Sequence, residues 1–169
     1  IEIINCNIPV SRGLGSSSSC IIAGIIGAFS IMGKDINKSE VLKYAVEIEG
    51  HPDNVCPAIY GGMVIAVMED NDPIFNEIDI KEGVSFVALI PEFKLSTEKA
   101  RSILPKEISL KDGIYNVGRT ALLVSAFANG NYNLLKYAMK DKFHQAYRSN
   151  LIEGYDKVIK ESMELGALG

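Results

Sequence analysis

The residues Ile8-Pro9-Val10-Ser11-Arg12-Gly13-Leu14-Gly15-Ser16-Ser17-Ser18-Ser19 run directly into an apolar segment at 20–32, and this order is the most informative feature of the sequence. Gly13 and Gly15 allow the backbone to turn sharply and to approach a ligand closely. The serines expose hydroxyl donors and are expected to cap the N-terminus of the helix. The free N–H groups of the first helical turn then face the loop, where the helix dipole favours an anion. The stretch therefore predicts a phosphate-binding loop.

This loop differs from a Walker loop, because no Gly-Lys-Ser/Thr ends it. A flexible serine linker is the alternative, and the apolar helix that follows disfavours it. We therefore expect the phosphates of a nucleotide to contact the whole loop: Pro9, Val10, Ser11, Arg12, Gly13, Leu14, Gly15, Ser16, Ser17, Ser18 and Ser19.

The composition narrows the class of partner. The chain has 169 residues, is 47% hydrophobic and carries a formal net charge of −4. Acidic chains are poorly suited to nucleic acid or to a membrane surface, so we expect neither as a partner. The three cysteines, Cys6, Cys20 and Cys56, lack metal-ligand spacing. We interpret them as small buried apolar residues in a reducing compartment, which favours the cytoplasm.

Periodicity and turn residues predict a mixed chain of the α+β class. We expect helices at about 16–32, 37–50, 52–59, 97–104, 111–129, 132–140 and 154–165. We expect strands at about 1–5, 63–69, 74–80 and 84–90, the last of them buried. Asn37, followed three residues later by Glu40, predicts the cap of the second helix. The turn 81–83 suggests a domain boundary, which gives domains at 1–82 and 83–169.

The glycine-serine loop closely resembles the ATP signature of the GHMP kinase superfamily, which includes galactose, homoserine, mevalonate and phosphomevalonate kinases. The string Glu49-Gly50-His51-Pro52-Asp53-Asn54-Val55-Cys56-Pro57-Ala58-Ile59-Tyr60-Gly61-Gly62 resembles the block that marks the homoserine kinase branch. Two further strings, at 95–105 and 144–152, are similar to segments of that branch. The four strings occur in the expected order, so the resemblance covers nearly all of the chain.

The resemblance implies a two-domain fold, with an N-terminal part like domain 2 of ribosomal protein S5 and a ferredoxin-like C-terminal part. It also implies an internal piece of a longer enzyme, truncated at both ends. The chain starts at Ile1 without a methionine and stops at Gly169 in mid-pattern. The family's N-terminal segment and its C-terminal glycine-rich motif are then expected outside this sequence.

ATP and Mg²⁺ are the cofactors that the resemblance implies. Magnesium prefers oxygen ligands and usually takes one or two carboxylates together with phosphates. Among the serines we favour Ser17 as the metal ligand, with Ser16 second. Among the carboxylates we favour Glu49, with Glu47 as the alternative.

The segment from His51 to Asn54 is dense in polar groups beside an apolar run, which raises the expectation of a functional site. His51, Asp53 and Asn54 are expected to bind substrate. Asp53 can accept from an ammonium group, and Asn54 can hold a hydroxyl for in-line attack. The resemblance makes Asn54 a catalytic residue. Because an amide cannot take a proton at neutral pH, the proton of the hydroxyl would go to the γ-phosphate or to water.

Arg101 and Arg148 are expected to bind a carboxylate, since a guanidinium group forms a two-pronged contact with it. Thr97 lies one helical turn before Arg101, so both residues share a face. The resemblance places Thr97 and Arg101 among the catalytic residues. His144 and Tyr147 flank Arg148 and are expected to support the site.

The function implied by the resemblance is the ATP-dependent phosphorylation of L-homoserine to O-phospho-L-homoserine, in threonine biosynthesis. Two alternatives stay open. One is another GHMP kinase of the shikimate or mevalonate-pathway type. The other is a non-catalytic fragment, because the isolated 169-residue chain is expected to be inactive. Homodimerisation is left open.

Overall fold

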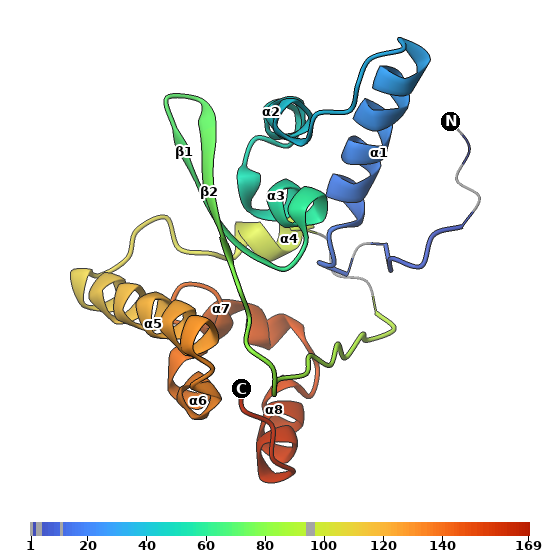
Figure 1. The fold of residues 1–169 in the computed structure, drawn as a ribbon. Helices are drawn as coiled ribbons and strands as arrows, with labels where there is room; N and C mark the ends of the chain where they lie inside the picture. Colours follow the sequence, from blue (N-terminus) through green and yellow to red (C-terminus); the bar gives the residue numbers. More distant parts are fainter. Residues whose placement is uncertain (1, 3–4, 11, 94–96) are drawn as a thin grey trace. The chain divides into compact units, whose positions relative to one another are not determined.

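The structure, a computed structural model, describes residues 2, 5–10, 12–93 and 97–169. The chain divides into two compact units, Ile1–Asp79 and Ile80–Gly169. Figure 1 shows helices in both units and a two-stranded sheet in the first, so the chain mixes α and β structure as predicted. The S5-like and ferredoxin-like assignments stay predictions.

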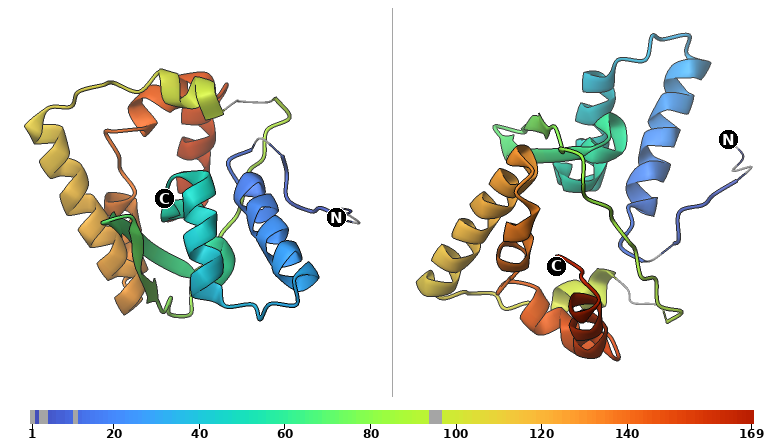
Figure 2. Two further views of the ribbon diagram at one scale, coloured as in Figure 1. Left: turned by 90° about the horizontal axis from the view of Figure 1, so that it is seen from above. Right: turned by 60° about the horizontal axis from the view of Figure 1, so that its bottom comes forward.

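The first unit consists of three helices followed by a β-hairpin. Its elements are α1 (Ser16–Ile31), α2 (Lys38–Glu49), α3 (Pro52–Tyr60), β1 (Met63–Glu69) and β2 (Asp72–Ile78). All three helices pack against one another, and α3 also contacts β1. The views of Figure 2 show α1 beside α2, with α3 next to both.

Local sequence explains where these helices begin and end. The Asn37 side chain accepts hydrogen bonds from the backbone N–H groups of Ser39 and Glu40, so the predicted cap of α2 is confirmed. Gly50 ends α2 with φ of 87°, a left-handed conformation that favours glycine. Pro52 occupies the start of α3, where its missing N–H group costs nothing.

The core of the first unit is an apolar cluster formed by the three helices. Its buried members are Ile22, Ile25, Phe29, Val41, Leu42, Ala45, Val46, Val55 and Cys56. The Phe29 ring also meets Tyr44 edge-on, with the ring centres 5.9 Å apart. Burial of this apolar surface holds α1, α2 and α3 against one another.

The turn of the β-hairpin is shorter than we predicted. Strands β1 and β2 pair in antiparallel register from Met63 with Ile78 to Glu69 with Asp72. Asp70 and Asn71 make the turn, with φ of 47° and 67°. Two residues with positive φ match the twist of the paired strands. The second strand therefore starts at Asp72 instead of the predicted residue 74.

The second unit is helical. Its elements are α4 (Thr97–Ser102), α5 (Leu110–Asn129), the 3₁₀ turn η1 (Tyr132–Leu134), α6 (Leu135–Ala138), α7 (Gln145–Arg148), the 3₁₀ turn η2 (Ser149–Leu151) and α8 (Tyr155–Glu164). The Ser109 hydroxyl caps α5 by accepting the N–H of Asp112 at 3.1 Å. The predicted helix at 132–140 is shorter, because it divides into η1 and α6. Helix α7 was not predicted.

The prediction of a buried strand at 84–90 is wrong. These residues have no regular structure, and Phe86, Val87 and Leu89 are exposed. A strand needs a paired neighbour for its backbone groups, and in the described residues β2 pairs only with β1. The predicted strand at 1–5 includes Ile1, Ile3 and Ile4, which lie outside the described residues.

The interpretation of the cysteines holds for one of the three. Cys56 is buried in the core, and burial raises the pKa of its thiol, with the Glu77 carboxylate adding to the effect. Cys6 and Cys20 are exposed, so the interpretation as buried residues is wrong for them. Cys20 lies on the outer side of α1, whereas Ile22 and Ile25 face the core. In the described part of the chain, no helix is long and apolar enough to cross a membrane.

Candidate functional site

The predicted phosphate loop leads into the N-terminus of α1. Gly13 and Gly15 have φ of 71° and 75°, so both adopt the left-handed conformation that the sequence led us to expect. The predicted serine cap is wrong: the cap residue of α1 is Gly15, which has no side chain to bond to the helix. The first N–H groups of α1 therefore lack a capping side chain at this position, as a helical anion site requires. Ser11 lies outside the described residues.

One contact links the start of α1 to the end of α2. Ser18, only 1% exposed, donates from its Oγ atom to Oε1 of Glu49 at 3.4 Å. Glu49 is the last residue of α2 and is half-buried, whereas Glu47 is exposed. The carboxylate that we favoured, Glu49, therefore lies next to the first turn of α1. The serine that contacts it is Ser18, whereas Ser17, our predicted metal ligand, is exposed.

The segment after α2 brings further polar groups close to Glu49. His51 is the cap residue of α3, and its Nδ1 atom contacts Oδ1 of Asp53. The same oxygen accepts the backbone N–H of Asn54 at 3.1 Å. Asp53 and Asn54 are exposed, so their side chains are accessible to a small molecule. The connection from α2 to α3 therefore presents a histidine, a carboxylate and an amide within six residues of Glu49.

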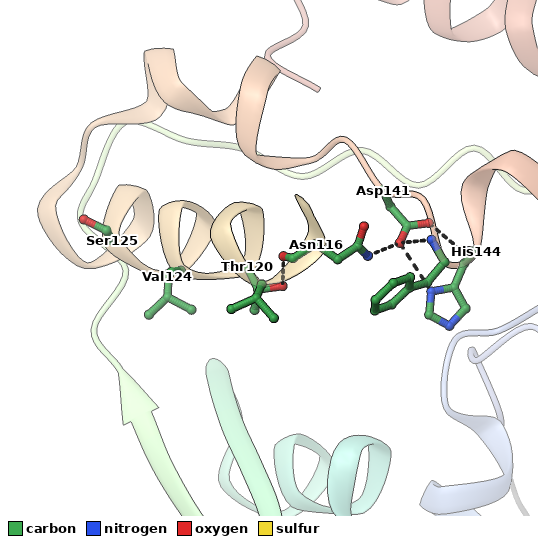
Figure 3. Close-up of a pocket in the computed structure, with 9 residues that line it drawn as sticks. Asn116, Thr120, Val124, Ser125, Asp141 and His144 are labelled. Atoms are coloured by element: carbon green, nitrogen blue, oxygen red, sulfur yellow. Dashed lines mark hydrogen bonds and ion pairs between the residues drawn. The ribbon is translucent and has the colours of Figure 1, made fainter. Parts of the chain in front are cut away.

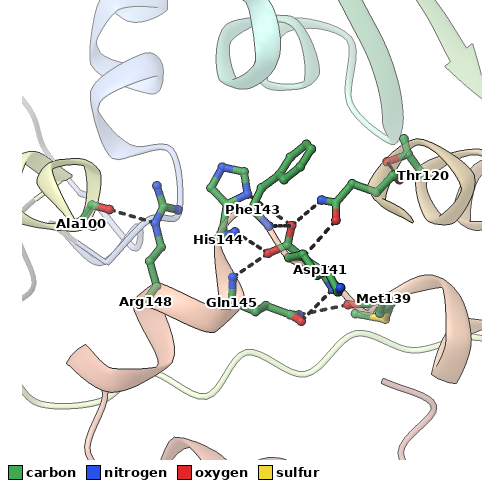
Figure 4. A network of polar contacts seen from close by, with 10 residues as sticks. Ala100, Thr120, Met139, Asp141, Phe143, His144, Gln145 and Arg148 are labelled. Atoms are coloured by element: carbon green, nitrogen blue, oxygen red, sulfur yellow. Dashed lines mark hydrogen bonds and ion pairs between the residues drawn. The ribbon is translucent and has the colours of Figure 1, made fainter. Parts of the chain in front are cut away.

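In the second unit, Arg148 lies against α4, the helix that carries Arg101. Its Nε atom donates to the carbonyl oxygen of Ala100 at 3.0 Å (Figure 4). Ala100 is the residue before Arg101, so the two predicted arginines come from adjoining segments of this unit. Thr97 is the first residue of α4. The predicted residues of the first unit and those of the second therefore form two groups.

Asp141 holds the turn that precedes Arg148. Its carboxylate accepts backbone N–H groups from Phe143 at 3.0 Å, His144 at 2.6 Å and Gln145 at 2.5 Å, and the Asn116 side chain at 2.6 Å (Figure 4). Burial acts to raise the pKa of Asp141. The hydrogen bonds outweigh it and lower the pKa to about 2. Asp141 is therefore ionised at neutral pH.

Neither Asn116 nor Asp141 was among our predicted site residues. The only local signal was a carboxylate three residues before His144, a spacing typical of a helix cap. Asn116 lies 25 positions before Asp141, so the sequence alone offers no sign of their contact. The guanidinium of Arg119 lies over the Tyr115 ring, 3.5 Å from the ring centre.

An open pocket of about 790 Å³ lies along α5 and the turn at 141–144 (Figure 3). Val117, Ala121 and Val124 of α5 form its apolar wall. Its polar groups include Asn116 and Asp141, which are hydrogen-bonded to each other. Because Asn116 and Asp141 already have hydrogen-bond partners, the pocket is a weaker candidate for the functional site than the loop and Glu49.

Comparison with known proteins gives a family match for the first part of the chain. Residues 1–62, which include the loop, Glu49 and Asn54, match the family of GHMP kinases N terminal domains. This part of the chain is therefore similar to the N-terminal domain of GHMP kinases. The resemblance inferred from the glycine-serine loop is thereby confirmed.

Curated relatives of this chain are homoserine kinases. It is 58% identical over 168 residues to the homoserine kinase of Clostridium beijerinckii, covering 99% of this chain and 56% of the relative. It is 54% identical over 169 residues to that of Clostridium botulinum strain Eklund 17B, covering 100% of this chain and 57% of the relative. The chain thus spans 56–57% of the length of these curated relatives.

Solved structures of a homoserine kinase and a putative homoserine kinase are also similar to this chain. The crystal structure of homoserine kinase from Cytophaga hutchinsonii matches with a TM-score of 0.83 and 30% identity, covering 97% of this chain and 54% of that one. A putative homoserine kinase from Listeria monocytogenes matches with a TM-score of 0.64 and 27% identity, covering 85% and 49%.

Proposed function

We propose that this chain belongs to an ATP-dependent homoserine kinase. In the reaction, the side-chain hydroxyl oxygen of L-homoserine bonds to the γ-phosphorus of ATP. The bond from that phosphorus to the bridging oxygen breaks, and ADP leaves with the electron pair. The observation that carries the proposal is the Ser18–Glu49 contact, because it joins the phosphate loop to a carboxylate in a chain similar to homoserine kinases over its full length.

The loop residues 9–19 would bind the phosphates of ATP through backbone N–H groups, as the uncapped start of α1 supports. Ser18 and Glu49 would hold Mg²⁺, because a hydroxyl and a carboxylate are the hard oxygen ligands that this ion prefers. Ser17 stays a candidate ligand. Among the described residues no group of three or more histidine, cysteine or acidic side chains gathers. A site completed by phosphate oxygens does not need one. When bound, Mg²⁺ would neutralise phosphate charge.

The residues proposed to bind substrate would each contact a particular group of homoserine. Asp53 would accept the ammonium group of homoserine, and Asn54 would orient its hydroxyl. Arg101 and Arg148 would bind its carboxylate, and Thr97 would assist them. The proton of the hydroxyl would pass to the γ-phosphate or to water, since Asn54 cannot accept it. His51 would orient Asp53, which its Nδ1 atom contacts.

A shikimate or mevalonate-pathway kinase is less well supported, because the curated relatives of high identity are homoserine kinases. Mevalonate offers a carboxylate without an ammonium group, so it would leave Asp53 without a partner. We also place the enzyme in the cytoplasm, as its three free cysteines suggest. The activity of the isolated 169-residue chain is a separate question, because the relatives are longer.

The test is steady-state phosphoryl transfer with homoserine, galactose, shikimate and mevalonate offered in parallel. It should be run on the 169-residue chain and on a protein in which this chain is extended to the length of its relatives. We expect turnover of homoserine alone in the longer protein. Comparable turnover of another substrate there would reject homoserine as the substrate. Equal activity of both proteins would reject the expectation that the isolated chain is inactive.

A further inference from the structure

The short helix α7 depends on its neighbours for its position. It has four residues, Gln145–Arg148, and so short a helix has little stability of its own. Its first N–H groups are held by the Asp141 carboxylate at 2.5–2.6 Å. The N–H of Asp141 in turn donates to Oε1 of Gln145 at 3.1 Å. These reciprocal bonds fix where α7 begins.

The turn is also attached to α5. Nδ2 of Asn116 donates to Asp141 at 2.6 Å, and Oδ1 of Asn116 accepts the N–H of Lys142 at 2.9 Å. Helix α5 has 20 residues, and its buried members Ala126 and Phe127 anchor it. A long anchored helix therefore sets the position of the Asp141 turn.

Arg148 lies one turn beyond these bonds. Its backbone N–H donates to the carbonyl oxygen of His144 at 2.8 Å, and its Nε atom donates to Ala100 of α4 at 3.0 Å. Within the described part of the chain, its two Nη groups make no further hydrogen bond or ion pair. A guanidinium in this state is held by one nitrogen and can offer the other two to a carboxylate.

We infer that Asp141, bound to α5 through Asn116, is a positioning residue for Arg148 and sets the affinity for the substrate carboxylate. This inference rests on the proposed function, because it takes Arg148 as a ligand of the homoserine carboxylate. Asp141 itself does not contact substrate. Its oxygens already accept four hydrogen bonds, and its side chain is 20% exposed.

The first experiment measures the position of Arg148 without any substrate. Exchange of the Arg148 Nε–H with solvent is followed by NMR in the wild-type chain, in Asp141→Asn and in Asn116→Ala. The control is Asp112→Asn, which removes a carboxylate that binds Lys142 in the same unit but does not bind the backbone at 143–145. We expect exchange at least about tenfold faster in Asp141→Asn, a smaller increase in Asn116→Ala and little change in the control.

The second experiment measures kinetics in the protein extended to the length of its relatives. Asp141→Asn should raise the homoserine KM about tenfold or more, as expected when a binding group is displaced by a fraction of an ångström, while the ATP KM stays within about twofold. In the background of Arg148→Ala, the same substitution should have little further effect on the homoserine KM, because Asp141 acts through that arginine. Asp112→Asn should leave both KM values unchanged.

The outcomes separate the two proposals. Unchanged Nε–H exchange in Asp141→Asn overturns the positioning role, whatever the enzyme phosphorylates. Equal rises in both KM values, or an undiminished effect in the Arg148→Ala background, also overturn it. If the exchange result is as expected and the wild-type protein turns over another substrate, the positioning of Arg148 stands and the homoserine assignment fails.

Discussion

The ionised Asp141 should stabilise the second unit at neutral pH, and this stabilisation should be lost in acid. Its pKa is lowered from 3.8 to about 2 by hydrogen bonds that outweigh the opposing effect of burial. At about 1.4 kcal/mol per pKa unit, the charge contributes about 2 kcal/mol at neutral pH. Because the pKa is lower in the folded state, this contribution is present above pH 4. It is lost as the pH falls towards 2, and about half remains at pH 3.

The assay is urea unfolding of the wild-type chain and Asp141→Asn between pH 7 and pH 3. Near-UV circular dichroism is a suitable probe, because most of the seven tyrosines lie in the second unit. We expect a difference in unfolding free energy of about 2 kcal/mol at pH 7 that falls to about half by pH 3. The exposed Asp156 provides the control Asp156→Asn, which should stay within about 0.5 kcal/mol of wild type. A difference that is the same at every pH would refute the reasoning.

Three further predictions concern the candidate site and the first unit. Glu49→Gln should raise the ATP KM and lower kcat with little effect on homoserine binding; if only Glu47→Gln does so, Glu47 is the metal ligand. Arg101→Lys keeps the charge but loses the planar fork, so it should raise the homoserine KM with little change for ATP, and an unchanged KM would remove Arg101 from the site. Asn37→Ala removes the two hydrogen bonds to backbone N–H groups that cap α2 and should cost about 1 kcal/mol in urea unfolding; no loss would contradict its role as a cap.

Much of the first unit could be predicted because its signals are local. The glycine-serine order before an apolar run fixed the start of α1 at Ser16, and Asn37 and Pro52 marked the starts of the next two helices. The strand at 63–69 was predicted with the bounds that β1 has. In each case the deciding residues lie within a few positions of the boundary that they set.

The sequence was less informative wherever a distant partner decides the outcome. The segment 84–90 is apolar and β-prone, but no described strand pairs with it, so it forms no strand. We favoured Ser17 as the metal ligand, with Ser16 second, whereas the serine that contacts Glu49 is Ser18. Sequence spacing did not show which side of α1 faces Glu49, and neighbouring serines are chemically alike. The contact between Asn116 and Asp141 depends on how α5 lies against a turn 25 residues away.

The most direct test of the account is amide hydrogen exchange in the protein extended to the length of its relatives, with and without a non-hydrolysable ATP analogue, Mg²⁺ and homoserine. We expect the analogue to slow exchange in the loop 12–19 and homoserine to slow it at 97–104 and 144–149. Protection of the α5 pocket at 116–125, with no change in the loop, would contradict the assignment of the site.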